Sequence, residues 1–209
     1  MIEARRLEGA RGERTLFRDL SFTVSPGELL RITGPNGAGK TTLMRILCGL
    51  SLQAGGEVLW NGEPIQRNRA AFHAELVYIG HASGLKADLT AAENLRIICA
   101  LHGNDPGEDA ILAALDTMGL AAQAELPAKV LSQGQRRRVS LARLIAEPAC
   151  RLWILDEPFA ALDVNATEQL RLIVEKHHSD GGMAIFTTHQ EVPLPSRSLK
   201  TVDLTGARP

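Results

Sequence analysis

A glycine-rich segment at residues 34–41 constrains the fold of this chain more than any other feature. It reads Gly-Pro-Asn-Gly-Ala-Gly-Lys-Thr and fits the spacing G-x-x-x-x-G-K-[ST] in full. The apolar run Leu29–Thr33 before it predicts a buried strand, and Thr42–Leu50 after it predicts a helix with one apolar face. A strand, a glycine-rich turn and a helix in this order place backbone N–H groups and a helix N-terminus around one anion. The sequence therefore predicts a phosphate-binding loop and a nucleoside triphosphate as its ligand.

The residues of this loop have separate expected roles. Lys40 is expected to reach the β- and γ-phosphates, and the Thr41 hydroxyl is expected to bind Mg²⁺. The glycines let the backbone approach the phosphates and adopt positive φ where the turn needs it. The residues predicted to contact the nucleotide here are Gly34, Pro35, Asn36, Gly37, Ala38, Gly39, Lys40, Thr41 and Thr42.

A pair of acidic residues follows a later apolar run. Leu152–Leu155 predicts a buried strand, and Asp156 and Glu157 come directly after it. Phosphoryl transfer needs one carboxylate near the metal-bound phosphate oxygens and another near the attacking water. We therefore expect Asp156 to hold Mg²⁺ and Glu157 to orient and polarise the water. An acidic turn without chemistry is the alternative, and the complete phosphate loop upstream weighs against it.

The composition is that of a folded domain without a strong electrostatic field. The chain has 209 residues, of which 44% are hydrophobic, and a formal net charge of −1. This balance does not favour nucleic acid as a partner. The three cysteines are widely spaced without a Cys-x-x-Cys pair, so neither a disulfide framework nor a zinc site is expected, and a reducing compartment is favoured. Since no apolar run reaches about 18 residues, the chain is not expected to span a membrane by itself.

The order of strand and helix patterns predicts an α/β fold. Residues 1–33 are expected to form short strands, and residues 88–125 have the spacing of helices, interrupted at Gly103–Gly107. Further strands are expected at Gly55–Gly62, Leu76–Gly80, Leu152–Leu155 and Met183–Thr187. Strands that alternate with helices indicate a parallel sheet with helices on both faces. The helical block reads as a small inserted lobe.

The segment from Leu131 to Arg143 indicates the class of ATPase. Residues 131–135 read Leu-Ser-Gln-Gly-Gln, which resembles the Leu-Ser-Gly-Gly-Gln signature of ATP-binding cassette (ABC) ATPases. Gln133 replaces the first glycine, whereas Ser132, Gly134 and Gln135 match. These residues open a helix whose positive end can face a phosphate. In the family that phosphate belongs to ATP held by a second nucleotide-binding subunit, so the resemblance implies that Ser132, Gly134 and Gln135 contact nucleotide across a dimer.

Further features of the family occur in the right order. Ala161–Asp163 resembles the loop that crosses the dimer interface, which implies a nucleotide contact for Asp163, and Thr187–His189 resembles the segment whose histidine contacts the γ-phosphate. Arg136–Arg138 is interpreted as a solvated helix face rather than a nucleic-acid patch because the overall charge is nearly neutral. The resemblance implies a P-loop NTPase fold with a RecA-like core, an N-terminal antiparallel β subdomain and an inserted helical subdomain at about residues 82–135. All belong to a single ABC domain over residues 1–209.

Two positions depart from the family pattern. The family has a glutamine near Mg²⁺ and the attacking water at the strand end before the helical lobe, and His81 occupies that place here. An imidazole can still hydrogen-bond water, so His81 stays a candidate catalytic residue beside Glu157 and His189. The aromatic residue that stacks on adenine would fall at Arg11. Because a guanidinium can also stack on a base, we expect base contact to be altered and discrimination between ATP and other triphosphates to be weak.

One branch of the family matches in more detail. Gly80-His81, the run Gly84–Leu95 and Thr187–Gln190 together resemble the small haem-exporter ATPase (CcmA type) of bacterial cytochrome c maturation. The resemblance implies that ATP hydrolysis works with haem-handling integral membrane subunits, either to export haem or to release a haem-loaded chaperone. Two alternatives stay open, namely the ATPase subunit of another ABC transporter and a soluble non-transport ABC ATPase acting on DNA or ribosomes.

The same resemblance sets expectations for ligands, partners and location. It implies ATP and Mg²⁺ as ligands, an ATP-dependent homodimer, and a peripheral position on the cytoplasmic face of the bacterial inner membrane. The helical lobe and the groove near His81 are the expected docking surface for the membrane subunits. A cassette that only binds ATP is disfavoured because Glu157 and His189 fill both catalytic positions.

Overall fold

The computed structural model describes residues 1–190, 192–194 and 198–205, so the rest of the domain predicted over residues 1–209 lies outside the described residues. Its strands are β1 Ile2–Arg11, β2 Arg14–Val24, β3 Leu29–Thr33, β4 Gly55–Trp60, β5 Glu63–Pro64, β6 Leu76–Ile79, β7 Leu152–Leu155, β8 Met183–Thr187 and β9 Leu199–Asp203. Its helices are α1 Lys40–Leu47, α2 Arg69–Ala74, α3 Ala91–Leu101, α4 Glu108–Thr117, α5 Gln133–Ala146 and α6 Val164–Ser179, with 3₁₀ turns at Ala121–Gln123 and Ala128–Val130.

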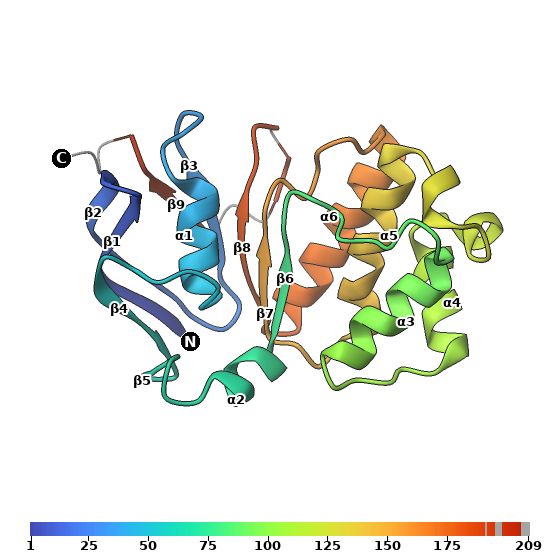
Figure 1. Cartoon of the computed structure of the whole chain (residues 1–209), viewed down its shortest axis with the longest axis horizontal. Coiled ribbons are helices and arrows are strands. Elements are labelled where there is room, and N and C mark those ends of the chain that lie inside the picture. The colour runs from blue at the N-terminus through green and yellow to red at the C-terminus, as the bar shows by residue number, and fades with distance from the viewer. Residues whose placement is uncertain (191, 195–197, 206–209) are drawn as a thin grey trace.

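Two sheets and two groups of helices lie in layers (Figure 1). The antiparallel sheet has the strand order β2-β1-β4-β5, and the parallel sheet has the order β6-β7-β8-β3-β9. Helix α1 lies between the two sheets, and α5 and α6 cover the opposite face of the parallel sheet (Figure 1). The structure confirms the predicted α/β fold with helices on both faces.

Side-chain alternation along the central strands explains why both faces of the parallel sheet are buried. In β7, Leu152 and Ile154 join the core around α1, whereas Trp153 and Leu155 join the core around α5 and α6. Since consecutive strand residues point to opposite faces, a continuous apolar run can fill two cores at once. This packing places the carboxyl ends of β3, β7 and β8 at one edge of the sheet.

The first two strands are longer than the sequence analysis expected. β1 has 10 residues and β2 has 11, but their pairing shifts register at several points, including between Ala4 and Leu7. Arg6 and Asp19, with φ of 47° and 49°, mark such irregularities. Bulges of this kind interrupt the alternation of polar and apolar residues, so the prediction of short strands was wrong. The correct reading is one long bulged pair.

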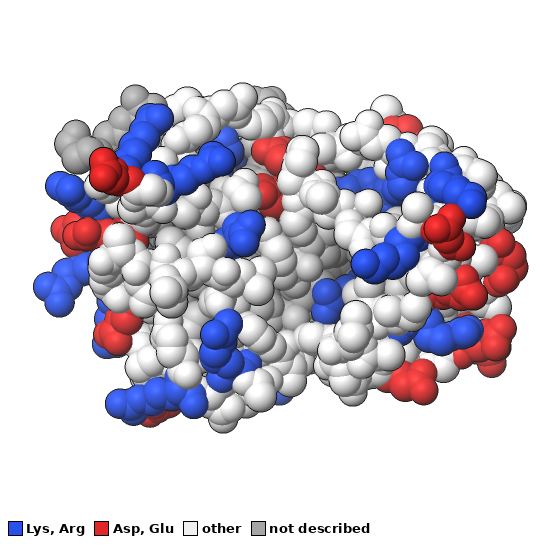
Figure 2. All heavy atoms as spheres, viewed as in Figure 1, with Lys and Arg blue, Asp and Glu red and all other residues white. Residues whose placement is uncertain are grey.

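The predicted helical block forms α3 and α4, and the break at 103–107 lies between them as expected. Thr90 starts α3 with a capping box, in which its hydroxyl accepts from the Glu93 N–H at 3.1 Å and the Glu93 carboxylate accepts from the Thr90 N–H at 2.8 Å. Helices α3, α4 and α5 pack against one another. Acidic side chains gather over the end of the molecule that α4 occupies (Figure 2).

Two further observations bear on the sequence analysis. Among the described residues, no helix combines the length and the apolar character that crossing a bilayer would require. The three cysteines, Cys48, Cys99 and Cys150, all belong to the described chain, are buried and have free thiols.

Candidate active site

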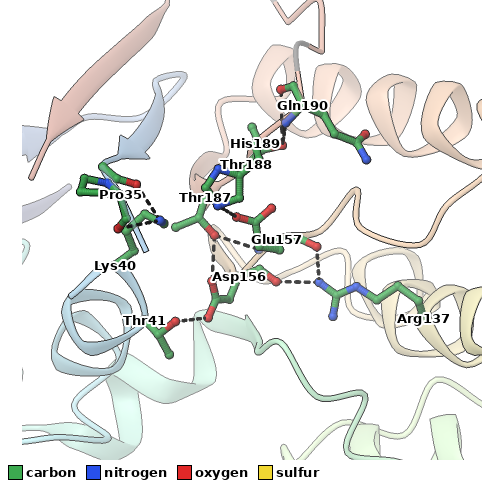
Figure 3. A network of polar contacts seen from close by, with 11 residues as sticks. Pro35, Lys40, Thr41, Arg137, Asp156, Glu157, Thr187, Thr188, His189 and Gln190 are labelled. Carbon is green, nitrogen blue, oxygen red and sulfur yellow. Dashed lines mark hydrogen bonds and ion pairs between the residues drawn. The ribbon is translucent and has the colours of Figure 1, made fainter. Parts of the chain in front are cut away.

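The glycine-rich segment connects β3 to α1 as the sequence predicted. Gly34, Gly37 and Gly39 have φ of 139°, 78° and 102°, in the region that favours glycine. Gly39 is the N-cap of α1, and in the described chain no side chain caps this helix, which leaves the positive helix end open to an anion. Lys40 folds back over the loop, where its Nζ donates to the carbonyls of Gly34 at 2.7 Å and Pro35 at 3.3 Å (Figure 3).

The two residues predicted to bind Mg²⁺ meet at the edge of the sheet. The Thr41 hydroxyl donates to Oδ2 of Asp156 at 2.8 Å, although the residues lie 115 positions apart. Asp156 is buried at the end of β7, and its N–H donates to the Ile79 carbonyl at 2.8 Å. A hydroxyl and a carboxylate that share one small space are the oxygen ligands that suit Mg²⁺. The residues present therefore fit this ion.

Thr187, at the end of β8, holds the two acidic residues in place. Its hydroxyl donates to Oδ1 of Asp156 at 2.8 Å and accepts from the Glu157 N–H at 2.8 Å (Figure 3). The Thr187 side chain is fully buried. The sequence analysis did not assign it a role, although its position two residues before His189 at a strand end was a usable signal.

Glu157 is held with a free acceptor on its carboxylate. Its φ is 50°, a backbone conformation that L-residues adopt at a cost. Within the described residues, its Oε1 is buried and has no hydrogen-bond donor, while Nε2 of His189 lies 3.4 Å away at ion-pair distance. This contact between His189 and Glu157 is weak, because 61% of the His189 side chain is exposed to solvent. About 18% of the Glu157 side chain is exposed, so the carboxylate can meet a water molecule in the nucleotide cleft.

The arginine segment of α5 corrects one interpretation made from the sequence. Arg137 is buried, and its guanidinium donates to the carbonyls of Asp156 at 2.7 Å and Glu157 at 2.9 Å (Figure 3). It also donates to the Gly80 carbonyl at 2.7 Å. Its burial lowers the pKa of Arg137, and the nearby carboxylates of Asp156 and Glu157 oppose that shift. The reading of Arg136–Arg138 as a solvated face was therefore wrong for Arg137. One face of α5 is turned toward the strand ends, and charge patterning could not show which.

A cleft of about 460 Å³ brings most of the predicted residues together. His81, Glu157 and His189, the three catalytic candidates, all line it, and Arg11 lies in its wall beside Leu16. Of the predicted loop residues, Gly34, Pro35 and Ala38 do not line the cleft, and Ala38 is buried. The full lining is Arg11, Leu16, Asn36, Gly37, Gly39, Lys40, Thr41, Thr42, His81, Asp156, Glu157 and His189.

The signature residues lie outside this cleft. Ser132 is the N-cap of α5, where its hydroxyl accepts from the Gln135 N–H at 3.1 Å and the Gln135 side chain accepts from the Ser132 N–H at 2.8 Å. Gly134 packs so closely that a Cβ there would lie 2.8 Å from the Ala161 carbonyl oxygen. Asp163 caps α6 by accepting from the Ala166 N–H at 2.8 Å. These four residues stand in cap and packing roles within the chain.

A second hollow of about 330 Å³ adjoins the cleft and is lined by residues of the signature helix and of the loop after Glu157. His81 and Glu157 line both hollows, so they connect the cleft to the N-terminus of α5.

Comparison with known proteins places this arrangement in context. Residues 17–160 match the family described as ABC transporter. Similar proteins include the cytochrome c biogenesis ATP-binding export protein CcmA of Nitrosomonas europaea, which is 55% identical over 92% of this chain and 90% of its own length. The CcmA protein of Salmonella typhi is 51% identical over 99% of this chain and 98% of its own length. A dimeric ATP-binding cassette solved in a post-hydrolysis state with ADP and Pi has a similar fold, with a TM-score of 0.81 at 24% identity over 91% of this chain and 88% of its own.

Proposed function

Since this chain belongs to the ABC transporter family of ATPases, we propose that it is the ATP-hydrolysing subunit of a membrane complex that handles haem in cytochrome c biogenesis. One observation carries the proposal, namely identity above 50% to CcmA proteins over nearly the whole chain. The alternatives from the sequence, another ABC transporter or a non-transport ABC ATPase, have no comparable support.

The cleft supports a division of roles in ATP hydrolysis. Residues 34–42 surround the phosphates, and Lys40 exchanges its carbonyl partners for the β- and γ-phosphates. Thr41 and Asp156 hold Mg²⁺, which when bound neutralises charge on the phosphate oxygens. Glu157 orients the attacking water through its partly exposed carboxylate, and His189 contacts the γ-phosphate from the exposed rim. His81, which lines the same cleft, hydrogen-bonds the water.

The signature residues imply that a second copy completes the site. Ser132, Gly134 and Gln135 open α5 but do not line the cleft of their own chain. In a symmetric dimer each α5 N-terminus faces the triphosphate held by the other copy, and Asp163 lies in the loop at that interface. The cassette of similar fold described above is a dimer with ADP and Pi bound. Two ATP molecules are then held between two chains, and hydrolysis reopens the dimer.

The membrane association belongs to the complex. In the proposed complex, integral membrane subunits supply the transmembrane part of the machine. We place the chain on the cytoplasmic face of the bacterial inner membrane, with the lobe of α3 and α4 and the groove near His81 as the surface that meets those subunits. Haem export and release of a haem-loaded chaperone are both compatible with this placement.

A gene replacement in the native bacterium tests the function. Cells that lack the gene should lose covalently attached haem in c-type cytochromes, measured by haem staining of separated proteins. The wild-type gene should restore the stain, whereas Glu157→Gln should not. Glu168→Gln makes the same chemical change on an exposed face of α6 and should behave as wild type. Normal cytochromes in the deleted cells, together with ATP hydrolysis by the purified chain, would remove the haem role and keep the ATPase.

A further inference from the structure

A cluster of potential metal ligands lies at the other end of the parallel sheet, away from the nucleotide cleft. His102 is the C-cap of α3, Glu147 is the C-cap of α5, and Cys150 comes two residues before β7. One ligand atom of each residue lies within 4.8 Å of the others. Glu147 and Cys150 are buried, and only 15% of the His102 side chain is exposed. The proposed ATPase mechanism uses none of these three residues.

The hydrogen bonds around the cluster orient all three side chains. Nε2 of His102 lies 2.5 Å from the His73 carbonyl oxygen, which can only accept, so this nitrogen carries a hydrogen. Nδ1 lies 2.6 Å from Oε1 of Glu147, with one proton between them, and the second carboxylate oxygen pairs with Arg143. In protein metal sites, hydrogen bonds to the atoms that do not bind the metal fix the orientation of the ligands. Here the His73 carbonyl holds the imidazole of His102, and Arg143 holds the second carboxylate oxygen of Glu147.

We propose that His102, Glu147 and Cys150 form a binding site for Zn²⁺, with Nδ1, Oε1 and Sγ as ligands. Bond lengths of about 2.1 Å to nitrogen and oxygen and about 2.3 Å to sulfur put tetrahedral ligands about 3.4 Å (N to O) and about 3.6 Å (N to S) apart. The present separations from Nδ1 are 2.6 Å to Oε1 and 4.0 Å to Sγ. Both separations from Nδ1 therefore change by less than an ångström when the site forms, all three ligand atoms already lie within 4.8 Å of one another, and a water completes the fourth position.

The charge of the cluster stays constant when the ion binds. One proton leaves the His102–Glu147 hydrogen bond and one leaves the Cys150 thiol, so two positive charges depart as Zn²⁺ arrives. Arg143, which would disfavour an added cation, therefore faces the same net charge before and after binding. On binding, the Cys150 thiol exchanges a 3.7 Å contact with the Ala74 carbonyl, and a proton that burial holds on the sulfur by raising its pKa, for the bond to zinc.

An entry path leads to the site from solvent. Cys150 lines a hollow of about 660 Å³ together with Glu75, Pro148 and Arg151. The bound ion joins the ends of α3 and α5 to the segment before β7, and His73 of α2 supports it through its carbonyl. Zn²⁺ in this position fastens the helical lobe to the parallel sheet. The pattern was invisible in the sequence because the ligands are up to 48 residues apart.

Metal titration of the full-length chain, stripped of metal and without nucleotide, tests the site. Co²⁺ should bind one ion per chain with a thiolate-to-cobalt absorption band, and Zn²⁺ should displace it and raise the melting temperature. Cys150→Ser should lose the band and weaken Zn²⁺ binding about 10-fold or more, while Cys48→Ser, at a buried cysteine outside the cluster, should keep both.

The titration also contains the results that would overturn the proposal. These are the absence of a thiolate band in the wild-type chain, an equal band in Cys150→Ser, or no rise in melting temperature with Zn²⁺. If Cys150→Ser does not fold, His102→Gln replaces it and should weaken Zn²⁺ binding by a similar factor. Undiminished binding in that variant would mean that the cluster is only an ion-pair network. None of these readouts depends on ATP hydrolysis, so the test is independent of the proposed function.

Discussion

Replacing Thr187 with valine removes one hydroxyl and almost no volume, which makes it a sharp test of how the catalytic carboxylates are held. The hydroxyl donates to Oδ1 of Asp156 and accepts from the Glu157 N–H, both at 2.8 Å, in a fully buried position. A lost hydrogen bond to a charged group costs about 1.5–3 kcal/mol, and a buried N–H without an acceptor costs about 1–3 kcal/mol. After the gain from burying a methyl group, we expect Thr187→Val to lower the free energy of unfolding by about 3 kcal/mol.

Urea denaturation measures this loss, and Thr187→Ser is the matched control. Serine keeps the hydroxyl and removes one methyl group, so it should cost only about 1 kcal/mol and retain most of the ATPase rate. Thr187→Val should also lower the rate more than Thr187→Ser, because Asp156 and Glu157 lose their shared anchor. If the two variants are equally stable, or the valine variant matches wild type, the hydroxyl does not hold the site.

Four other outcomes follow from the structure. The single ammonium of Arg137→Lys cannot reach the three carbonyls that the guanidinium fork of Arg137 binds. The substitution should therefore lower the unfolding free energy by about 2 kcal/mol in urea denaturation and slow ATP hydrolysis; an unchanged midpoint would contradict this. Gly134→Ala should leave ATP affinity intact but cut turnover about 10-fold or more, because its Cβ would meet the Ala161 carbonyl oxygen at 2.8 Å. A loss of ATP affinity with unchanged turnover would contradict this expectation. Burial lowers the pKa of His177 in the folded chain, so below about pH 6.5 the unfolded chain binds a proton that the folded chain does not. The free energy of unfolding should therefore fall as the pH drops below about 6.5. His177→Phe should reduce this fall in denaturation curves measured from pH 5 to 8. With Arg11 in the cleft wall, ATP and GTP affinities should lie within about 10-fold of each other, and a steep preference for ATP in a binding titration would refute base contact by a guanidinium.

The sequence predicted those parts of the site that local patterns encode. The phosphate loop has a fixed spacing between a strand and a helix, and Asp156 and Glu157 follow an apolar strand, so their meeting with Thr41 follows from the shared edge of a parallel sheet. His81 and His189 also follow strands and reach the same cleft. Each of these residues has its position set by the strand directly before it.

Features that depend on how distant elements pack could not be predicted in the same way. Arg137 looks like its neighbours in the sequence, and only the rotation of α5 against the strand ends buries it. The bulges in the β1–β2 pair interrupt the alternation of polar and apolar residues, so the sequence did not predict these two long strands. The sequence analysis did not predict helix α6, although an aspartate at the N-cap, Asp163, and the four-residue spacing of Leu170 and Val174 are helix signals.

The molar mass of the Glu157→Gln variant with ATP and Mg²⁺, measured by light scattering on a size-exclusion column, tests the composite active site most directly. The variant keeps every phosphate contact and loses the group that activates water, so ATP should hold two copies together. The account predicts twice the mass of one chain in ATP, one chain mass without nucleotide, and turnover reduced by about 100-fold or more. A variant that binds ATP as a monomer, or that hydrolyses ATP at the wild-type rate, would contradict it.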